Sequence, residues 1–292
     1  MAGLFVTFEG GDGAGKSTQV AALANELERR GYDVVISREP GGTELGQAIR
    51  ELLLHGSDVA PRAEALLFAA DRAHHVASKI RPALERGAVV ISDRYLDSSV
   101  AYQGAARALN PYEVRELSLW ATNGLLPRLT VLLDLPVEQG FDRRGGNHDR
   151  MESEGEDFQR RVRQSFLALA EAEPQRFLVV DGRLAIADIS THIWAAVQPL
   201  LDESQLSKRE GASQSASSQS ALREEVDLGD SDGMGSSGDS GDSSNLGDAS
   251  ETTGEAAVRE TVACEATSFI PKQLIPKQLI PKQSEQRESE VR

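Results

Sequence analysis

The sequence predicts an α/β fold in which helices cover both faces of a five-stranded parallel sheet. Short apolar runs alternate with amphipathic helical patterns from the amino terminus to about residue 202. The first apolar run leads through a glycine-rich loop into a helical pattern, and two later runs end in charged residues. Ligands of open parallel sheets bind at the carboxyl ends of the strands. These observations favour one three-layer α/β/α domain with its site at that edge.

The first strand and helix flank a phosphate-binding pattern. Leu4–Phe8 is apolar and β-favouring, and Gln19–Arg30 has helical spacing. The residues between them fit G-x-x-x-x-G-K-[ST], a loop whose backbone N–H groups hold a polyphosphate. In such a loop Lys16 neutralises phosphate charge and the Ser17 hydroxyl contacts Mg²⁺. The sequence therefore predicts a nucleoside triphosphate site here.

The second strand is expected over Tyr32–Ser37, and it runs into the loop Arg38–Thr43. Its Pro-Gly-Gly content predicts a turn. Because the loop follows the carboxyl end of a strand, Arg38 is a candidate anion contact, although an exposed loop arginine is the alternative.

Two helices are expected next, over Thr43–His55 and from Pro61 to about Ile80. Phe68 and Arg72 are four residues apart and share one face of the second helix. An arginine beside a phenylalanine suggests that this face borders a polar cavity. In the first helix the pattern places Leu45, Ala48, Ile49, Leu52 and Leu53 inward.

A third strand over Ala88–Ser92 ends in a second charged group. The Asp93 carboxylate is suited to hold Mg²⁺-bound water or to order an arginine, and Arg94 is suited to grip a phosphate. In the following segment Ser99, Tyr102 and Gln103 fall within one helical turn, which is more polar than a core-facing turn needs.

The remaining elements follow the same alternation. We expect a helix from Pro111 to about Gly124, strands over 129–135 and 177–181, and helices over 158–172 and 185–201. The segment 142–152 is crowded with charge and glycine. A solvated loop is the simple interpretation, but three arginines beside Gly145-Gly146 favour a mobile lid that brings cations over phosphates.

Composition divides the chain into a domain over 1–202 and an acidic Ser/Gly-rich tail over 203–292, which is too polar to fold alone. The formal net charge of −15 is shared between both parts, so no nucleic-acid partner is expected. Cys264 is the only cysteine, which excludes an intrachain disulfide and a cysteine-based zinc site. No apolar stretch is long enough to span a membrane. We therefore expect a cytoplasmic protein without a membrane partner.

With these motifs assembled, the chain resembles the thymidylate kinase family over roughly residues 3–201. The resemblance rests on the glycine-rich loop, the Arg38–Thr43 loop, the Phe68–Arg72 helix, the Asp93-Arg94-Tyr95 group with Tyr102-Gln103-Gly104, and Asp149–Glu152. It implies a P-loop kinase that transfers the γ-phosphoryl group of ATP to dTMP, giving dTDP and ADP for dTTP synthesis. It also implies Mg²⁺ as cofactor and a homodimer.

The resemblance assigns roles to individual residues. ATP would be held by Gly10, Gly11, Asp12, Gly13, Ala14, Gly15, Lys16, Ser17 and Thr18. Substrate would be held by Asp12, Arg38, Phe68, Arg72, Arg94, Ser98, Ser99, Tyr102 and Gln103. Within this set Arg38 and Arg94 would grip the 5′-phosphate and Phe68 would stack on thymine. Arg72 would bond the base edge, and Tyr102 would occupy the place of a ribose 2′-hydroxyl. Ser17 and Asp93 would organise the metal.

The glycine-rich loop carries no arginine, which matches family members that supply the catalytic arginine from the lid. The expected catalytic residues are Lys16, Arg94 and Asp12, together with one lid arginine. The candidates for the lid arginine are Arg143, Arg144 and Arg150, and we favour Arg144. The expected reaction is direct in-line transfer without a general base, because a phosphate oxygen of dTMP is already ionised.

Two alternatives stay open at this level. A P-loop deoxynucleoside kinase would need a base for a hydroxyl acceptor, whereas Arg38 and Arg94 favour a monophosphate. A regulatory P-loop ATPase switch would need no pocket built from Phe68, Arg72 and Tyr102.

In the tail, Ile-Pro-Lys-Gln-Leu repeats over 270–283. Repeat expansion is the simpler interpretation, and a motif for an unidentified partner is the alternative.

Overall fold

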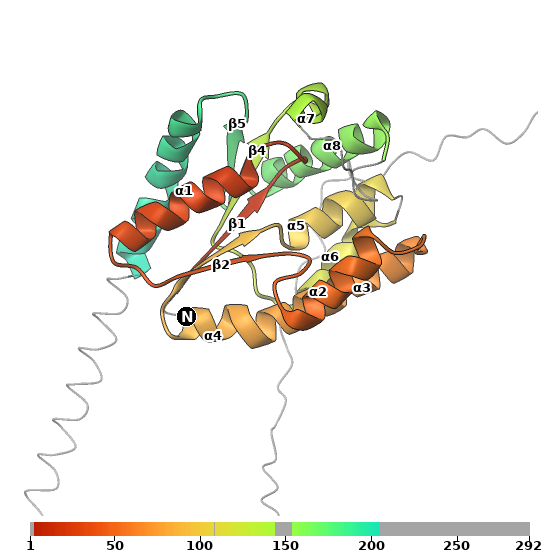
Figure 1. Ribbon diagram of the computed structural model, residues 1–292, viewed down its shortest axis with the longest axis horizontal. Coiled ribbons are helices and arrows are strands. Elements are labelled where there is room, and N and C mark those ends of the chain that lie inside the picture. The colour runs from red at the N-terminus through yellow and green to blue at the C-terminus, as the bar shows by residue number, and fades with distance from the viewer. Residues whose placement is uncertain (1–2, 108, 144–153, 205–292) are drawn as a thin grey trace, which may run out of the picture. The chain divides into compact units, whose positions relative to one another are not determined.

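The computed structural model describes residues 3–107, 109–143 and 154–204 (Figure 1). Its five strands form one parallel sheet in the order β2-β3-β1-β4-β5. They are β1 Leu4–Glu9, β2 Val34–Arg38, β3 Val89–Asp93, β4 Leu129–Asp134 and β5 Phe177–Asp181. The predicted five-stranded parallel α/β architecture is confirmed.

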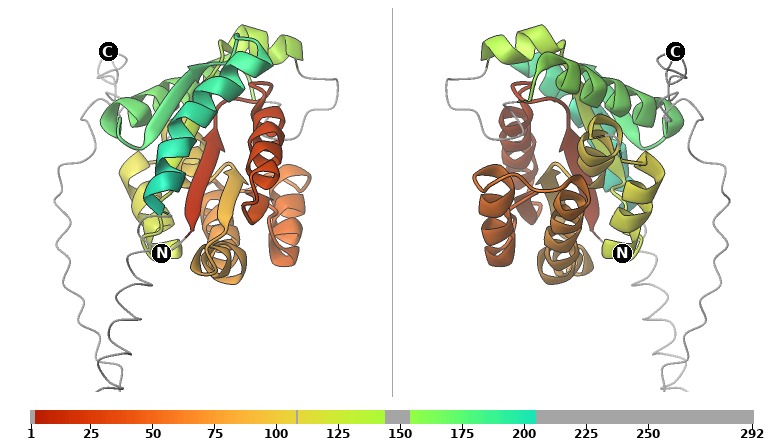
Figure 2. Two further views of the ribbon diagram at one scale, coloured as in Figure 1. Left: turned by 90° about the vertical axis from the view of Figure 1, so that its left-hand side faces the viewer. Right: turned by 90° about the vertical axis from the view of Figure 1, so that its right-hand side faces the viewer.

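Helices lie on both faces of the sheet (Figure 1, Figure 2). They are α1 Lys16–Arg29, α2 Glu44–Leu54, α3 Pro61–His75, α4 Arg81–Glu85, α5 Leu96–Ser99, α6 Pro111–Ala121, α7 Val137–Arg143, α8 Glu156–Ala172 and a helix over 186–204. Two π-helical turns, Val76–Ile80 and Val100–Ala106, join α3 to α4 and extend α5. The single helix predicted from Pro61 to about Ile80 is thus α3 followed by a π-helical turn, and the helical run continues through α4 to Glu85.

The alternation of side chains along the strands creates two cores. Leu4, Val6 and Phe8 of β1 pack on one face against α1 and the helix over 186–204. Phe5 belongs to the core on the other face, which is formed with side chains of α2, α3, α4, α5, α8 and the two π-helical turns. Because each face of the sheet is covered by its own helical layer, the three-layer prediction is confirmed.

The pairing register aligns the carboxyl ends of the central strands. Phe8 of β1 and Arg38 of β2 both lie opposite Asp93 of β3. The two charged loops recognised in the sequence therefore leave the sheet side by side, next to the loop that follows β1.

One prediction about α2 is wrong. Leu45 and Leu52 are 48% and 57% exposed, and Ala48 is exposed as well. Ile49 and Leu53 face the core as predicted. The helix turns a narrower stripe inward than its apolar pattern suggests, and Gly46 lies on its buried side, close to Asp71 of α3.

The segment predicted to be a lid lies mostly outside the described residues, since 144–153 are not among them. The same holds for residues 205–292 of the predicted tail. The final helix runs to residue 204, two residues past the predicted domain end.

Candidate active site

The glycine-rich loop connects β1 to α1 in a conformation that excludes larger residues. Gly10 and Gly13 have φ of 135° and 80°. A Cβ on Gly10 would lie 2.5 Å from the carbonyl oxygen of Leu133, and one on Gly13 would lie 2.6 Å from that of Gly140. Glycine is therefore required at both positions by backbone angle and by space.

Lys16 begins α1 and is buried over this loop. Its Nζ donates to the carbonyl oxygens of Gly10 at 3.0 Å and Gly11 at 2.9 Å, and lies 4.0 Å from Asp12 Oδ1. Burial, followed by the nearby Arg94 charge, lowers the pKa of Lys16. An anion bound at this loop would favour the charged ammonium.

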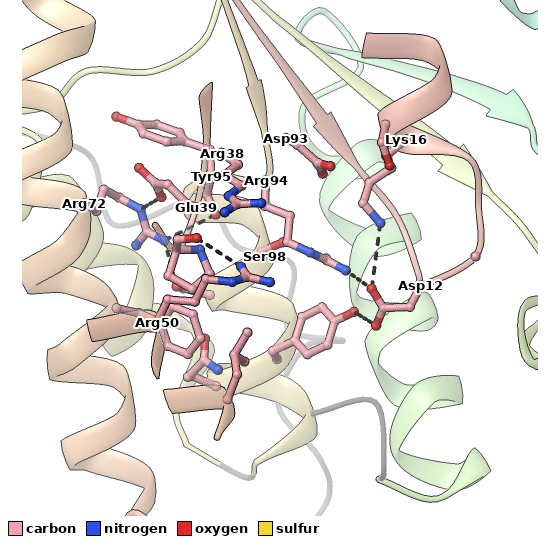
Figure 3. Close-up of a pocket in the computed structure, with 18 of the residues that line it drawn as sticks. Asp12, Lys16, Arg38, Glu39, Arg50, Arg72, Asp93, Arg94, Tyr95 and Ser98 are labelled. Carbon is pink, nitrogen blue, oxygen red and sulfur yellow. Dashed lines mark hydrogen bonds and ion pairs between the residues drawn. The ribbon is translucent and has the colours of Figure 1, made fainter. Parts of the chain in front are cut away.

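Arg94 follows β3 and has a left-handed backbone with φ of 69°. Its Nη1 donates to the Gly10 carbonyl at 3.3 Å and to Ser98 Oγ at 3.1 Å, and its Nη2 forms an ion pair with Asp12 (Figure 3). The guanidinium also lies over the Tyr102 ring, 5.0 Å from its centroid. The loop after β1 and the loop after β3 are thus joined by one cation.

Tyr102 closes this group from the π-helical turn Val100–Ala106. Burial raises the pKa of the Tyr102 phenol well above its usual value, so the hydroxyl keeps its proton. It donates to Asp12 Oδ2 at 3.4 Å.

Glu9, the last residue of β1, is a buried carboxylate that sequence reasoning missed. It accepts hydrogen bonds from the backbone N–H of Tyr95 at 2.8 Å and of Ser98 at 3.2 Å, and from Ser98 Oγ at 2.6 Å. Burial and the Asp97 carboxylate raise its pKa to about 7. Glu9 therefore fixes the turn that carries Arg94. An acidic residue at the end of an otherwise apolar strand was the signal for it.

Arg72 of α3 is 1% exposed and is held by four contacts. Nε donates to Glu39 Oε2 at 2.7 Å and Nη1 to Ser118 Oγ at 3.1 Å, while Nη2 donates to the Tyr95 carbonyl at 3.3 Å and Ser99 Oγ at 3.0 Å. These contacts use four of its five N–H donors. The remaining donor belongs to Nη1.

Glu39 anchors Arg72 and belongs to a buried chain of polar groups. Its Oε1 lies 2.9 Å from His75 Nδ1, and His75 Nε2 lies 2.6 Å from Ser37 Oγ. Sequence reasoning assigned no role to Glu39, because its partners lie 33 and 36 residues away.

A cavity of about 440 Å³ brings the predicted substrate residues together (Figure 3). All nine of them line it: Asp12, Arg38, Phe68, Arg72, Arg94, Ser98, Ser99, Tyr102 and Gln103. The loop contributes Gly13, Gly15, Lys16 and Ser17 to the same cavity. Sequence reasoning did not assign Glu39, Pro40, Arg50, Leu54 and Tyr95, which also line it.

The other predicted phosphate-loop residues lie around this cavity. Gly10 and Gly11 line a smaller neighbouring hollow, Ala14 is buried and Thr18 is exposed on the first turn of α1. Gly10 and Gly11 also use their carbonyl groups to hold Lys16.

The predicted metal residues fit a magnesium ion. Asp93 Oδ1 is buried and has no hydrogen-bond partner among the described residues, and Ser17 lines the same cavity. In the described ranges no cluster of three or more His, Cys, Asp and Glu side chains is arranged to hold a metal. Magnesium needs few protein ligands, because waters and phosphate oxygens complete its shell. The carboxylate that pairs with Arg94 is Asp12, whereas the sequence suggested Asp93.

The three candidate lid arginines are only partly described. Arg143, at the end of α7, donates from Nη1 to the Gly182 carbonyl at 3.0 Å and is not among the residues that line the cavity. Arg144 and Arg150 lie outside the described residues.

In the parts of the chain that the structure covers, no helix is both long and apolar enough to cross a membrane.

Comparisons with known proteins point to one family. The family model for thymidylate kinase matches residues 8–193. A thymidylate kinase of Bifidobacterium longum subsp. infantis is 56% identical over 233 residues, covering 76% of this chain and 100% of the relative. One of Leifsonia xyli subsp. xyli is 62% identical over 195 residues, covering 65% of this chain and 92% of the relative. The crystal structure of thymidylate kinase from Ehrlichia chaffeensis matches with a TM-score of 0.56 and 30% identity, over 67% of this chain and 98% of that one.

Proposed function

The chain belongs to the thymidylate kinase family, and from this premise we propose that it transfers the γ-phosphoryl group of ATP to dTMP in the cavity described above. One observation carries the proposal: a phosphate-binding loop, two arginines suited to a second phosphate and an aromatic side chain line a single cavity. Such a cavity suits a nucleoside monophosphate next to a nucleoside triphosphate.

The acceptor phosphate binds between Arg38 and Arg94. Both line the cavity near Lys16, and Arg94 is already held toward the loop by Asp12 and Gly10. Guanidinium groups bind phosphate through paired hydrogen bonds. Incoming phosphate oxygens replace Asp12 as the partner of Arg94, which leaves Asp12 available to the sugar hydroxyl or the surroundings of the acceptor phosphate.

The nucleoside lies deeper in the cavity. Phe68 stacks on thymine, Arg72 bonds the base edge, and Ser98, Ser99 and Gln103 line its sides. Tyr102 occupies the place of a 2′-hydroxyl, because its own hydroxyl is held by Asp12. This arrangement favours deoxyribose.

The ATP phosphates bind the backbone N–H groups of the loop from Gly10 to Thr18 at the amino end of α1. Lys16 leaves the carbonyl groups of Gly10 and Gly11 for the phosphates. Ser17 and Asp93 would hold Mg²⁺ directly or through water. The ion, when bound, neutralises phosphate charge and aligns the β- and γ-phosphoryl groups.

Catalysis consists of positioning and charge neutralisation. A dTMP phosphate oxygen attacks the γ-phosphorus in line, the bond to the β-phosphate oxygen breaks, and no covalent enzyme intermediate forms. Lys16, Arg94 and a lid arginine stabilise the transferring group. Arg144 is the favoured lid residue, with Arg143 and Arg150 as the alternatives.

The proposal includes a homodimer. The helices α2, α3 and α6 pack in series and carry exposed apolar side chains, Leu45, Leu52, Leu66 and Trp120, the last 82% exposed. Exposed apolar groups of this size favour a protein interface. Sedimentation of the unmodified chain and of the Trp120→Glu variant tests this surface. A dimer is expected for the unmodified chain and a monomer for the variant, so equal masses would count against this surface.

The proposed location is cytoplasmic, where ATP and dTMP are both present. For the tail over 203–292, repeat expansion in a dispensable segment remains the favoured interpretation, and a motif for an unidentified partner is the alternative. Fractionation of cells that make the chain tests the location, and enrichment in a membrane fraction would contradict it.

The experiment for the proposed activity is product analysis. With ATP, Mg²⁺ and dTMP, dTDP and ADP are expected in equal amounts. ADP formed without dTDP would show hydrolysis and would overturn the proposal.

A further inference from the structure

Gln103 is the only side-chain amide among the described residues that line the cavity. Its NH₂ group can only donate hydrogen bonds, and its carbonyl oxygen can only accept them. It is 1% exposed, and its Nε2 donates to Glu64 Oε1 at 3.0 Å. The amide N–H₂ group is therefore directed at Glu64. Because Gln103 also lines the cavity, the carbonyl oxygen Oε1 is the acceptor that this side chain can offer to a ligand there.

Glu64 holds this orientation because it acts only as an acceptor. It lies on α3 and is 0% exposed. Its charge is balanced by Arg107, whose Nε and Nη2 lie 3.3 Å and 3.4 Å from its two oxygens. An ionised carboxylate has no proton to donate. Turning the Gln103 amide over would set its oxygen against two acceptor oxygens in a buried site, which is costly.

Arg107 is itself fixed in place. Its Nη1 forms an ion pair with Glu154, and its guanidinium lies 5.3 Å from the centroid of the Phe158 ring. The cation that pairs with Glu64 is thus held by Phe158 of α8 and by Glu154, which lies just before this helix.

Arg72 and Gln103 line the same cavity and together offer a ligand a defined hydrogen-bonding pattern. Arg72 can only donate, and Gln103 in this orientation accepts. A pyrimidine with a 4-oxo group and an N3–H offers the complementary acceptor and donor. A 4-amino pyrimidine offers a donor and an unprotonated N3, which is the reverse pattern.

We infer that Glu64 is a positioning residue that, through Gln103, makes the site select 4-oxo pyrimidine monophosphates over 4-amino ones. The inference rests on the proposed function. It assigns base selection to a buried carboxylate that is not among the residues lining the cavity.

The test compares kcat/KM for dTMP, dUMP and dCMP in the full chain and in Glu64→Gln. A glutamine at this position both donates and accepts, so Gln103 is free to turn over. The preference for dTMP over dCMP is expected to fall by about tenfold or more, as when a hydrogen-bonding pattern loses its fixed partner. The ratio of dTMP to dUMP is expected to stay the same, since both bases carry N3–H.

A general loosening of the site would lower kcat/KM for all three acceptors alike. The ratios between acceptors therefore separate a positioning role of Glu64 from an effect on stability. The matched control is Glu154→Gln, which removes another carboxylate from Arg107 and leaves Glu64 in place; its dTMP-to-dCMP ratio is expected to be unchanged. A second variant, Gln103→Met, removes the amide and is expected to lose the same preference whether or not Glu64→Gln folds.

An unchanged dTMP-to-dCMP ratio in folded Glu64→Gln, or in Gln103→Met, would overturn the inference and leave the proposed function standing. Absence of dTMP turnover in the unmodified chain would instead overturn the proposed function.

Discussion

Arg94 joins three parts of the candidate site, because its guanidinium contacts Gly10, Asp12 and Ser98. Lysine at this position would keep the charge and lose the paired geometry. Arg94→Lys is therefore expected to reduce kcat/KM for dTMP by roughly 100-fold, the size of one or two charge-assisted hydrogen bonds.

The control for this variant is Arg86→Lys, which alters an exposed ion pair with Asp33 away from the residues that line the cavity. Steady-state rates with dTMP should be unchanged in it. Equal rates for Arg94→Lys and the unmodified chain would remove Arg94 from the proposed phosphate site.

Glu9 gives the folded protein a defined pH dependence. Its pKa is raised from 4.5 to about 7, so the folded state keeps this proton over a range in which the unfolded chain has lost it. The contribution of Glu9 to stability is therefore greatest below pH 4.5 and is lost as the pH rises through 7.

Glu9→Gln removes this titration. Relative to the unmodified chain, the free energy of unfolding of the variant should increase by roughly 2 to 4 kcal/mol between about pH 5 and about pH 8. Urea unfolding at both pH values measures it. A difference between the two proteins that does not vary with pH would show that Glu9 titrates normally.

Residue pairs across the site were the hardest feature to predict from the sequence. The residues at strand ends, such as Arg38 and Arg94, were recognised because charge after an apolar run is unusual. Glu39 and Glu64 were not assigned, since their roles come from partners at least 33 residues away. No local pattern records such contacts.

At the scale of elements, the loop between β1 and α1 depends on glycine for reasons that a matched pair of variants separates. Gly13 and Gly31 have similar φ values of 80° and 84°, but a Cβ added at Gly13 would lie 2.6 Å from a backbone oxygen, whereas one added at Gly31 would meet open space. Gly13→Ala is expected to raise KM for ATP by about tenfold or more, because the loop must shift.

Gly31→Ala is expected to lower the free energy of unfolding by about 1 kcal/mol and to leave KM for ATP unchanged. Thermal unfolding and ATP titrations of both variants check the pair. If both variants had the same KM for ATP, the close approach of Gly13 to Gly140 would not matter for ATP binding.

All five strands were predicted to within about two residues because buried parallel strands are short apolar runs with clear boundaries. The exposed face of α2 was predicted wrongly, since Leu45 and Leu52 are as apolar as the residues that face the core. The π-helical turns were not predicted either. A widened turn depends on packing around it and leaves no pattern in the sequence.

For the whole molecule, the described domain contains every residue to which we assign substrate or ATP contacts, apart from two candidate lid arginines. The relatives are covered over 92% to 100% of their length by 65% to 76% of this chain. A chain that ends at Ser204 is therefore expected to keep its kcat/KM for dTMP. Comparison of rates for the two lengths measures this, and a large loss in the shorter chain would give the tail a part in the reaction.

The acceptor specificity of the proposed kinase is measured by the release of ADP from ATP and Mg²⁺ with dTMP, dUMP, dCMP, UMP and thymidine offered separately. Strong turnover is expected with dTMP, weaker turnover with dUMP and little with UMP or thymidine. Arg38 and Arg94 need a phosphate on the acceptor, and Tyr102 disfavours a 2′-hydroxyl. Equal ADP release with every acceptor, or with none, would contradict thymidylate kinase activity and leave a nucleotide-binding loop without an acceptor site.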